Sequence, residues 1–327
     1  MTRHLSNEGI EAAAMLEKLG VEAVRIELPF RLNHVNCFMA ENEQGWTVID
    51  AGLNNDNTRA LWERKLDGKK VTDLLVTHYH PDHFGYVGGL QEKTGAKVWM
   101  TEVDAQAGMA AWADPFLESI PGNYRTSGIP EEQSMQMTQN TEEFKPLVSP
   151  LPQIGEYLTE GDLVQIGRFD YRVIFTPGHS DGMICFYNEE QKTLFSADHI
   201  LPKITPNISY WFHGNADPLA SYLDSLKKVR ELDAEFVIPS HGKPFYDANQ
   251  RIDELLAHHD ERLDETLETI KKPLSIFGAC ENLFQRPLTV HEMRFAVGET
   301  LAHLENLRHR QECTREMVDG IWLYEKV

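Results

Sequence analysis

Short apolar runs rich in β-branched and aromatic residues alternate with helical periodicities along most of the chain. Such runs predict strands, whereas apolar residues that recur every three or four positions predict helices. The run Leu74-Leu75-Val76 is continuously apolar, as expected for a strand covered on both faces. Strands are predicted at residues 23–30, 35–41, 46–50, 71–77, 169–175, 183–187, 193–196 and 235–238, and helices at 58–66 and 218–232. This alternation predicts a layered α/β body with helices on both sides of the strands.

The segment 104–152 interrupts this alternation. It is rich in Met, Gln, Pro and Glu and carries large apolar side chains such as Met109, Trp112 and Phe116. We expect a helical insertion or cap here rather than further strands of the sheet. Two interpretations remain open: a Met-bearing lid beside an active site, or a pair of helices packed on the body.

The last eighty residues show helical periodicity and then a hairpin pattern. Helices are predicted at 252–270, 275–283 and 289–304. Thr289 and Glu292 form a capping-box pattern at the start of the third helix, and Asp319-Gly320 is a hairpin turn. Because three helices followed by a hairpin are typical of a winged helix, we predict a body over 1–247 and a winged-helix-like domain over 248–327.

Composition and charge exclude several classes of protein. The 327 residues carry 31 Lys and Arg against 51 Asp and Glu, a net charge of −20, and 41% of them are hydrophobic. This is ordinary globular composition and excludes a disordered or fibrous chain. A field of this sign repels phosphate backbones and anionic membrane surfaces. We therefore expect no DNA partner and no membrane association, and no apolar run reaches the length of a transmembrane helix.

The start of the chain and its cysteines bear on location. Residues 1–20 include three glutamates and no long apolar stretch, so a secretory signal is not expected. The four cysteines form no C-x-x-C pair, and Cys37 and Cys185 lie in apolar runs. These features predict buried free thiols and a reducing cytoplasm.

One segment concentrates polar residues directly after a buried strand: V-T-H-Y-H-P-D-H at 76–83. His78 and His80 are two residues apart, so in an extended loop their side chains point the same way and can reach one metal ion. Asp82 and His83 follow at the start of a predicted helix and can serve a second ion. Because burying so many polar groups is costly without a bound partner, the segment predicts a metal site. Imidazole and carboxylate ligands suit zinc, and also iron or manganese.

Three further polar residues stand shortly after other predicted strands: His179, Asp198 and His241. Open α/β sheets place their sites beyond the carboxyl ends of the strands. We therefore expect these side chains to supply the remaining metal ligands.

These residues carry a resemblance to a known family. The motifs T-H-Y-H-P-D-H, T-P-G-H-S, F-S-A-D-H and P-S-H-G are similar in order and spacing to the metal motifs of the metallo-β-lactamase superfamily, and the strand that ends in Asp50 resembles an early strand of that family. The match covers about residues 23–245 and implies a four-layer αββα sandwich. The tail from Ala248 resembles the winged-helix domain of one branch, which includes lactamase-beta-like hydrolases and an endoribonuclease.

The resemblance implies a role for each motif residue. One metal would be held by His78, His80 and His179, the other by Asp82, His83 and His241, with Asp198 bridging both. Two divalent ions, zinc first and iron or manganese as alternatives, would hold a hydroxide that attacks a carbonyl or phosphoryl centre. Asp82 would also be the catalytic residue that orients this nucleophile and handles its proton. Asp50 would orient a metal ligand from behind.

Differences from the motifs of related subfamilies narrow the range of substrates that we expect. The β-lactamases themselves lack the bridging aspartate, whereas Asp198 is present, so β-lactam hydrolysis is not expected. Quorum-quenching lactonases carry a tyrosine shortly after this aspartate, where Leu201 stands here. Flavodiiron proteins need a glutamate in place of His80. The additional domains of β-CASP nucleases and glyoxalase-type thioesterases do not match this sequence.

Residues near the motifs are candidates for substrate contact. His199, next to Asp198, either touches substrate or supports the site from behind. His34 lies in a predicted loop between the first strands, which approaches the metal mouth in this fold. The aromatic run Tyr210-Trp211-Phe212-His213 either lines a pocket for an apolar acyl group or packs in the core.

Three functions remain. The first is a dinuclear metal-dependent hydrolase that cleaves an ester, thioester or lactone in a small molecule. The second is a metal-dependent endoribonuclease of the winged-helix branch, and the third is a non-enzymatic winged-helix regulator. The tail from Ala248 carries 10 Lys and Arg against 15 Asp and Glu, a net charge of −5, which disfavours RNA as well as DNA. We expect the tail to pack on the body or to form a homodimer.

Overall fold

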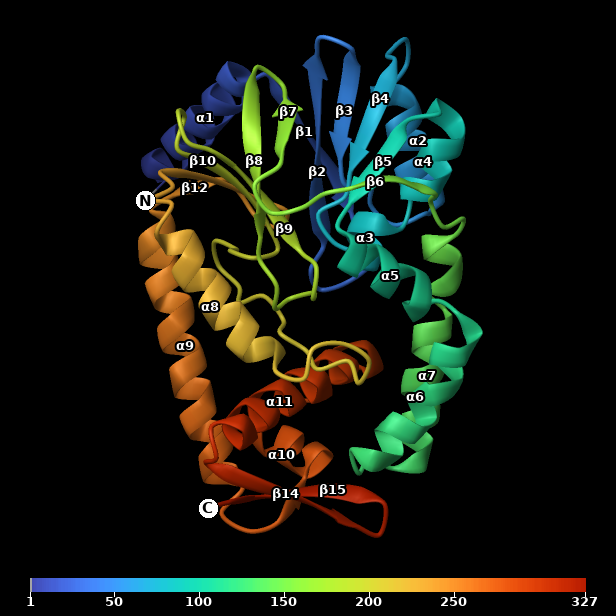
Figure 1. The fold of residues 1–327 in the computed structure, drawn as a ribbon, viewed down its shortest axis with the longest axis vertical. Coiled ribbons are helices and arrows are strands. Elements are labelled where there is room, and N and C mark those ends of the chain that lie inside the picture. Colours follow the sequence, from blue (N-terminus) through green and yellow to red (C-terminus); the bar gives the residue numbers. More distant parts are fainter. Residues whose placement is uncertain (1) are drawn as a thin grey trace.

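Two six-stranded sheets lie face to face at one end of the molecule (Figure 1). The structure, a computed structural model, describes the backbone of residues 2–327 and the side chains from Ile10 onward. The strand orders of the two sheets are β1-β2-β3-β4-β5-β6 and β12-β11-β10-β9-β8-β7.

The first sheet comes from the first half of the chain. Its strands are β1 (Val21–Glu27), β2 (His34–Asn42), β3 (Gly45–Ile49), β4 (Val71–Leu75), β5 (Lys97–Met100) and β6 (Ile154–Tyr157). The first three strands pair antiparallel, and β3 to β6 pair in parallel. Parallel neighbours need long crossovers, and α2 (Asp56–Lys65), α3 (Pro81–Phe84) and α4 (Val87–Thr94) supply the first two.

The second sheet follows along the chain. Its strands are β7 (Leu163–Ile166), β8 (Phe169–Phe175), β9 (Ile184–Asn188), β10 (Thr193–Ala197), β11 (Phe236–Pro239) and β12 (Phe245–Tyr246). β10 and β11 pair in parallel and are joined through α8 (Pro218–Arg230), whereas the other neighbours pair antiparallel.

Three hydrophobic clusters hold the layers together. Between the sheets lie buried side chains such as Phe38 and Phe186. Trp62 of α2 and Leu90 of α4 pack behind the first sheet, and Tyr222 of α8 packs behind the second. The order helix, sheet, sheet, helix confirms the predicted αββα sandwich.

All eight predicted strands are present, with ends displaced by at most three residues. The sequence patterns missed β5, β6, β7, β12, β13 (Leu274–Ser275) and the helix α1 (Thr2–Leu19). The missed strands have two to four residues, too few for an alternation to stand out. β6 and β7 are edge strands that leave large apolar side chains exposed, Tyr157 and Leu163 among them, so their apolar residues do not mark a buried face.

The segment between β5 and β6 is helical. Its elements are α5 (Glu102–Ala111), α6 (Asp114–Thr126), α7 (Glu131–Glu142) and the 3₁₀ turn η1 (Lys145–Val148), so it holds three helices rather than a pair. α6 packs on α7, and α7 packs on a helix of the C-terminal part, α11 (Val290–His309). In Figure 1, α6 and α7 stand along one side of the molecule below the sandwich.

The C-terminal part consists of three helices and a small sheet. Its elements are α9 (Ala248–Thr269), β13 (Leu274–Ser275), α10 (Ile276–Leu283), α11, β14 (Cys313–Val318) and β15 (Ile321–Lys326). The predicted capping box of Thr289 and Glu292 is present at α11. Within residues 2–327, no helix combines the length and apolar character needed to cross a membrane.

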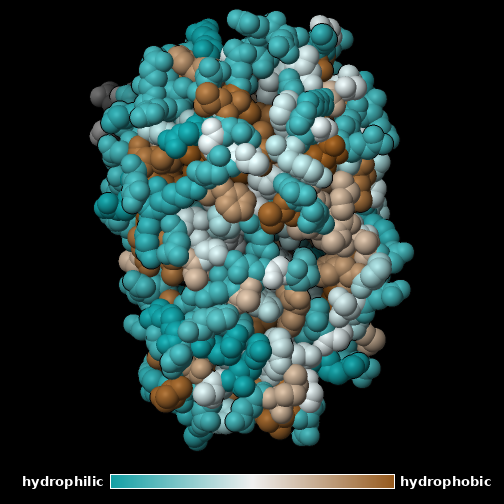
Figure 2. Space-filling model, in the orientation of Figure 1, coloured by the Kyte–Doolittle hydropathy of each residue, from teal (hydrophilic) through white to brown (hydrophobic). Residues whose placement is uncertain are grey.

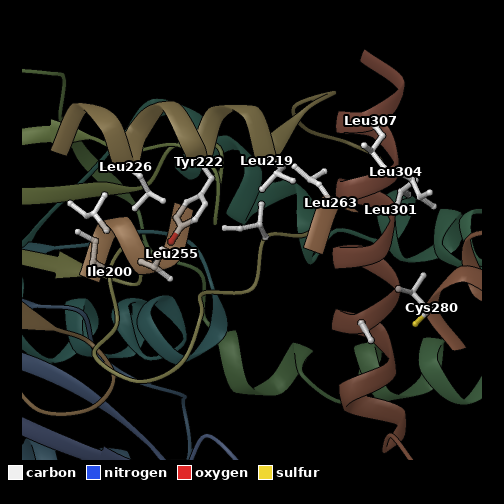
Figure 3. Packing of buried hydrophobic residues seen from close by; sticks show 14 of the residues in the cluster. Ile200, Leu219, Tyr222, Leu226, Leu255, Leu263, Cys280, Leu301, Leu304 and Leu307 are labelled. Carbon is white, nitrogen blue, oxygen red and sulfur yellow. The ribbon is translucent and has the colours of Figure 1, made fainter. Parts of the chain in front are cut away.

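The hydrophobic core does not break at the predicted boundary between residues 247 and 248. Leu301 and Leu304 of α11 belong to the same cluster as Leu219 and Tyr222 of α8 (Figure 3). The helix α9 contributes Leu255 to this cluster. The C-terminal part is therefore fused to the second sheet through one continuous core.

Glycines after β4 let α3 and α4 lie close to the end of the insertion. A Cβ at Gly88 would lie 1.9 Å from the carbonyl oxygen of Pro150, and one at Gly85 would lie 2.5 Å from that of Leu147. Contact with backbone atoms cannot be relieved by a change of rotamer. This close approach fixes the helices that follow the H-x-H-x-D-H motif.

We predict that Gly88→Ala lowers the free energy of unfolding by about 2 kcal/mol or more, because the added methyl group overpacks a backbone contact. Gly122→Ala is the matched control, since a Cβ at Gly122 in α6 meets nothing within 4 Å. Alanine there should be neutral or stabilising by up to about 1 kcal/mol. Denaturant unfolding followed by circular dichroism measures both, and equal stability of Gly88→Ala and the unmodified protein would contradict the prediction.

Candidate metal centre

Loops that follow four strands bring polar side chains to one edge of the sandwich. His78 and His80 lie after β4 with Asp82 and His83 in α3, His179 follows β8, Asp198 follows β10, and His241 follows β11. Local backbone geometry contributes at β10. Ala197 has a φ of 46°, in the left-handed region, and the pairing of β10 with β11 shifts register there. The chain therefore turns out of the strand directly before Asp198.

The structure brings together all seven side chains predicted as metal ligands. They form three overlapping groups whose ligand atoms lie within 4.8 Å of one another: His78, His80 and His179; His78, His83 and Asp198; and Asp82, His83 and His241. The first and last groups are the two sets expected from the sequence.

Asp198 lies between these two sets. Its Oδ2 is 3.4 Å from Nε2 of His179, 3.6 Å from Nε2 of His83 and 3.2 Å from Nε2 of His241. Oδ2 of Asp82 is 3.3 Å from the same nitrogen of His241. One carboxylate is thus shared by both sets, which is the placement that a bridging ligand needs.

Several of the clustered ligand atoms are buried without a hydrogen bond of good geometry. They are Nε2 of His78, His83 and His241, and Oδ1 of Asp198, all within the described part of the chain. Buried polar atoms are nearly always paired in proteins. Unpaired nitrogens that converge on carboxylates therefore fit a divalent cation, and this donor set suits zinc, iron or manganese.

Asp50 and Thr77 orient two of the ligand rings from behind. Asp50 accepts hydrogen bonds from the backbone N–H and the hydroxyl of Thr77, and its Oδ2 lies 2.8 Å from Nδ1 of His83. Because the Thr77 hydroxyl donates to Asp50, it accepts from Nδ1 of His78, 3.0 Å away. In both rings Nδ1 is occupied and Nε2 is left free for a metal. This geometry suits the role predicted for Asp50.

Backbone carbonyl groups orient two other rings. Nδ1 of His179 lies 2.8 Å from the carbonyl oxygen of Asn207, and Nδ1 of His241 lies 2.6 Å from that of His34. The imidazole of His34 instead accepts from the backbone N–H of Gly242 and is not among the cavity-lining residues. His34 is the first residue of β2 rather than part of a loop, which is why it lies behind His241 and not in the substrate pocket.

Burial and charge divide the five clustered imidazoles into two kinds. Burial lowers the pKa of His78 well below its ordinary value, that of His80 to about 3, and also that of His179. Burial acts in the same direction on His83 and His241, but the neighbouring carboxylates outweigh it. They raise the pKa of His83 well above its ordinary value and that of His241 to about 10. The first three rings are therefore held neutral, which is the form that binds metal.

A cavity of about 940 Å³ opens onto this cluster, and His80, Asp82, His179 and Asp198 form part of its wall. The rest of the wall is largely apolar and comes from the sandwich loops, the insertion and α11. Its aromatic side chains include Phe30, Trp112, Phe116, Tyr124, Phe144, Phe212 and Phe295. Figure 2 shows hydrophilic residues over most of the outer face, with small hydrophobic patches scattered among them, several over the sheets.

The aromatic run at 210–213 and His199 each had two possible positions, in the pocket or in the core, and the structure places them differently. Tyr210, Trp211 and His213 of the aromatic run line the cavity. His199 does not: it is fully buried, and its ring packs against Tyr222 with 5.3 Å between centroids. His199 therefore supports the site from within the core.

Part of the cavity wall was not predicted from the sequence. His291, Arg294, Phe295 and Gly298 of α11 line the cavity at spacings that place them on one helix face. The spacing was visible in the sequence. What the sequence does not show is that this face turns toward the metal cluster, because that depends on how α11 packs on α7 and α8.

Comparison with protein families gives two matches along the chain. Residues 31–241 match the family described as "Metallo-beta-lactamase superfamily". Residues 263–327 match the family described as "Metallo-beta-lactamase-like, C-terminal domain". Together the matches span the metal centre and most of the C-terminal part.

Individual relatives resemble the chain over nearly its whole length. A "Probable metallo-hydrolase YqjP" of Bacillus subtilis is 22% identical, over 90% of this chain and 94% of the relative. The crystal structure of a beta-lactamase domain protein from Burkholderia ambifaria has a TM-score of 0.83 at 34% identity, covering 94% of this chain and 92% of that one. A metallo-beta-lactamase family protein, TTHA1429 from Thermus thermophilus, has a TM-score of 0.84 at 31% identity, covering 94% and 99%.

We predict that Asp50→Asn weakens metal binding roughly 10- to 100-fold, because the neutral amide cannot accept all three hydrogen bonds that orient His83 and Thr77. Asp73→Asn is the control, since the Asp73 carboxylate accepts from Nε1 of Trp99 on the neighbouring strand and does not contact the cluster. Competition with a chromogenic chelator measures the affinity. Unchanged affinity in Asp50→Asn would rule out the orienting role.

Proposed function

The chain belongs to the metallo-beta-lactamase superfamily and is a metal-dependent hydrolase, and on this premise we propose that it binds two divalent ions and cleaves esters, thioesters or lactones. The observation that carries the proposal is the position of Asp198, whose Oδ2 lies within 3.2 to 3.6 Å of nitrogens from both ligand sets. The cavity beside it favours a small, largely apolar substrate.

Each ligand set has a composition that suits one ion. His78, His80 and His179 would hold the first, Asp82, His83 and His241 the second, and Asp198 would contact both. We propose zinc, with iron or manganese as the alternatives that the same donors accept. When bound, two such ions would lower the pKa of a water molecule and polarise the substrate carbonyl oxygen.

Asp82 is the side chain placed to handle the proton of the attacking water. It is the more accessible carboxylate of the cluster, with 20% of its side chain exposed against 8% for Asp198. Asp82 also lines the cavity, so a water molecule and a substrate can both reach it. We propose that its carboxylate orients the water, accepts its proton and returns a proton to the leaving alcohol or thiol.

The cavity supports an acyl substrate rather than a polynucleotide. Its wall combines apolar side chains with aromatic rings: His291 stacks on Phe30 at 4.6 Å between centroids, and Phe116 contacts His213 at 4.5 Å. Such a wall binds by excluding water from apolar groups. Of its three arginines, Arg31 and Arg286 lie within 4.0 Å of Glu292, which leaves little uncompensated positive charge for a phosphate backbone.

The C-terminal part has the three helices and the hairpin of a winged helix, and this supports membership of that branch. Its third helix is unsuited to reading a nucleic acid, because residues 300–307 of α11 are buried. The basic cluster at the end of α11 is also neutralised. Arg308 pairs with Glu305, His309 lies 3.5 Å from Asp217, and Arg310 pairs with Glu312. We therefore propose that this part serves the hydrolase body rather than a regulatory or ribonuclease function.

The cysteines support the proposed location. All four are free and buried, as expected for a protein of a reducing compartment. We propose the cytoplasm.

We predict about two equivalents of metal per chain in protein purified without chelator, measured by elemental analysis. Asp198→Ala should lose at least one equivalent and most of the activity while it keeps the fold, because both ligand sets lose the shared carboxylate. Asp224→Ala removes an exposed carboxylate from α8 and is the control. Two retained equivalents in Asp198→Ala would refute the bridging assignment.

We predict that the metal-loaded protein hydrolyses uncharged or singly charged esters or thioesters and does not bind duplex DNA or single-stranded RNA at about 50 mM salt. A surface of net charge −20 repels polyanions, and a binder that neutralises several phosphates would have high affinity at this salt. Turnover assays and fluorescence anisotropy with labelled oligonucleotides test the two halves. RNA cleavage that disappears in His80→Ala would instead favour the endoribonuclease.

A further inference from the structure

Arg294 of α11 is a cation of the cavity wall that has no carboxylate partner among the described residues. Two other arginines line the same cavity, Arg31 and Arg286, and both lie within 4.0 Å of Glu292. Arg294 donates to a neutral acceptor, Oδ1 of Asn140 in α7, at 3.3 Å. Its Nε is buried without any hydrogen-bond partner in the described part of the chain.

The surroundings of Arg294 compensate its charge only in part. The guanidinium carbon lies 5.7 Å from the ring centroid of Phe144 and 6.0 Å from that of Phe295. Burial lowers the pKa of Arg294, although the nearby side chain of Tyr124 acts to raise it. An arginine nevertheless keeps its proton in a protein, and a desolvated charge is costly without a counter-ion. The wall of the cavity therefore contains a cation with unused capacity to bind an anion.

Two more donors of the same cavity lack acceptors. Nε1 of Trp112, which follows α5, and Nε1 of Trp211, in the loop between β10 and α8, are buried without hydrogen-bond partners in the described residues. Both side chains line the cavity with Arg294. The carboxylates of this wall are already engaged, Asp82 and Asp198 in the metal cluster and Glu292 with its two arginines. Outside the metal cluster, the unpaired side-chain atoms of this wall are these three donors and Nδ1 of His291, so a ligand with acceptor oxygens complements most of them.

We propose that Arg294 binds an anionic group of the substrate, so that the preferred substrate is an ester or thioester with an apolar portion and a carboxylate or phosphate apart from the bond that is cleaved. The bidentate fork of arginine matches either group. The inference rests on the proposed function, because it assigns specificity to the same cavity. It gives the C-terminal part a role in substrate selection, since Arg294 is carried by α11.

A purely structural role for Arg294 makes different predictions. If the side chain only ties α11 to α7 through Asn140, its replacement would lower stability and would affect charged and neutral ligands equally. A specificity role affects the anionic ligand alone. The ratio between a charged ligand and its neutral isostere therefore distinguishes the two roles.

The first experiment measures binding without catalysis. The full chain, freed of metal by dialysis, is titrated with octanoate and with octanamide, and the quenching of tryptophan fluorescence is followed, since Trp112 and Trp211 line the cavity. We expect octanoate to bind roughly 10- to 100-fold more tightly, the range of a charge-assisted hydrogen bond. R294Q should abolish this preference, R294K should keep part of it, and R310Q should leave it intact because Arg310 pairs with Glu312 outside the cavity. Equal binding of the two ligands to the unmodified protein, or an undiminished preference in R294Q, would overturn the proposal.

The second experiment places the anionic group on the substrate. The metal-loaded enzyme is given three octanoyl-length thioesters: one neutral, one with a terminal carboxylate on the acyl chain, and one with a phosphate on the thiol portion. The substrate whose kcat/KM ratio to the neutral one falls in R294Q but not in R310Q identifies the group that Arg294 binds. If neither ratio changes in R294Q, Arg294 does not select substrates. If no thioester or ester is cleaved while octanoate still binds through Arg294, the proposed function fails and the anion site stands.

Discussion

Five imidazoles and two carboxylates can share one buried site only if every ring is held in a single orientation, because a ring free to rotate would bury an unpaired nitrogen wherever it pointed. The hydrogen bonds that fix the rings come from distant parts of the chain. Asp50 follows β3 of the first sheet, and Asn207 lies in the loop after β10 of the second. His34 begins β2, and its carbonyl group reaches His241 across the sandwich. The same strand donates from the amide of Asn36 to the carbonyl groups of Pro239 and Gly242. The rings therefore keep their orientations only when the two sheets are packed against each other.

That the seven side chains cluster could be predicted from the sequence, because each stands in a short motif after a strand. The residues that orient the clustered rings could be predicted from the sequence only in part. Asp50 was identified through its motif, but Asn207 and His34 act through backbone carbonyl groups, which every residue possesses and no motif marks. The sequence predicts His34 in a loop at the metal mouth and therefore in the pocket, whereas in the structure its carbonyl group contacts the cluster from behind. Short edge strands such as β6 were not predicted, because too few of their residues are buried to produce an alternating pattern.

The cavity shows a second limit of local patterns. Its wall combines sandwich loops, an insertion of three helices and one face of α11, three segments whose meeting point is set by tertiary packing. The insertion was expected either to close over a site or to pack on the body. In the structure it packs on α11, and side chains such as Phe116 and Tyr124 form part of the cavity wall. The net charge of the tail argues against a nucleic-acid partner. It did not indicate that an arginine of the tail faces the interior.

The continuous hydrophobic cluster that joins α8, α9 and α11 has a consequence for how enzymes of this architecture diversify. Removing the C-terminal part would expose side chains such as Tyr222 and Leu219, which are fully buried in the whole chain. The C-terminal part therefore cannot be replaced by another domain without matching substitutions in the body. By contrast, single residues on the cavity-facing side of α11 can be substituted without disturbing the clustered ligand residues, all of which precede Ala248. Selection for a new substrate would therefore be expected to produce point substitutions on that face of α11. The catalytic body and the C-terminal part would be inherited together.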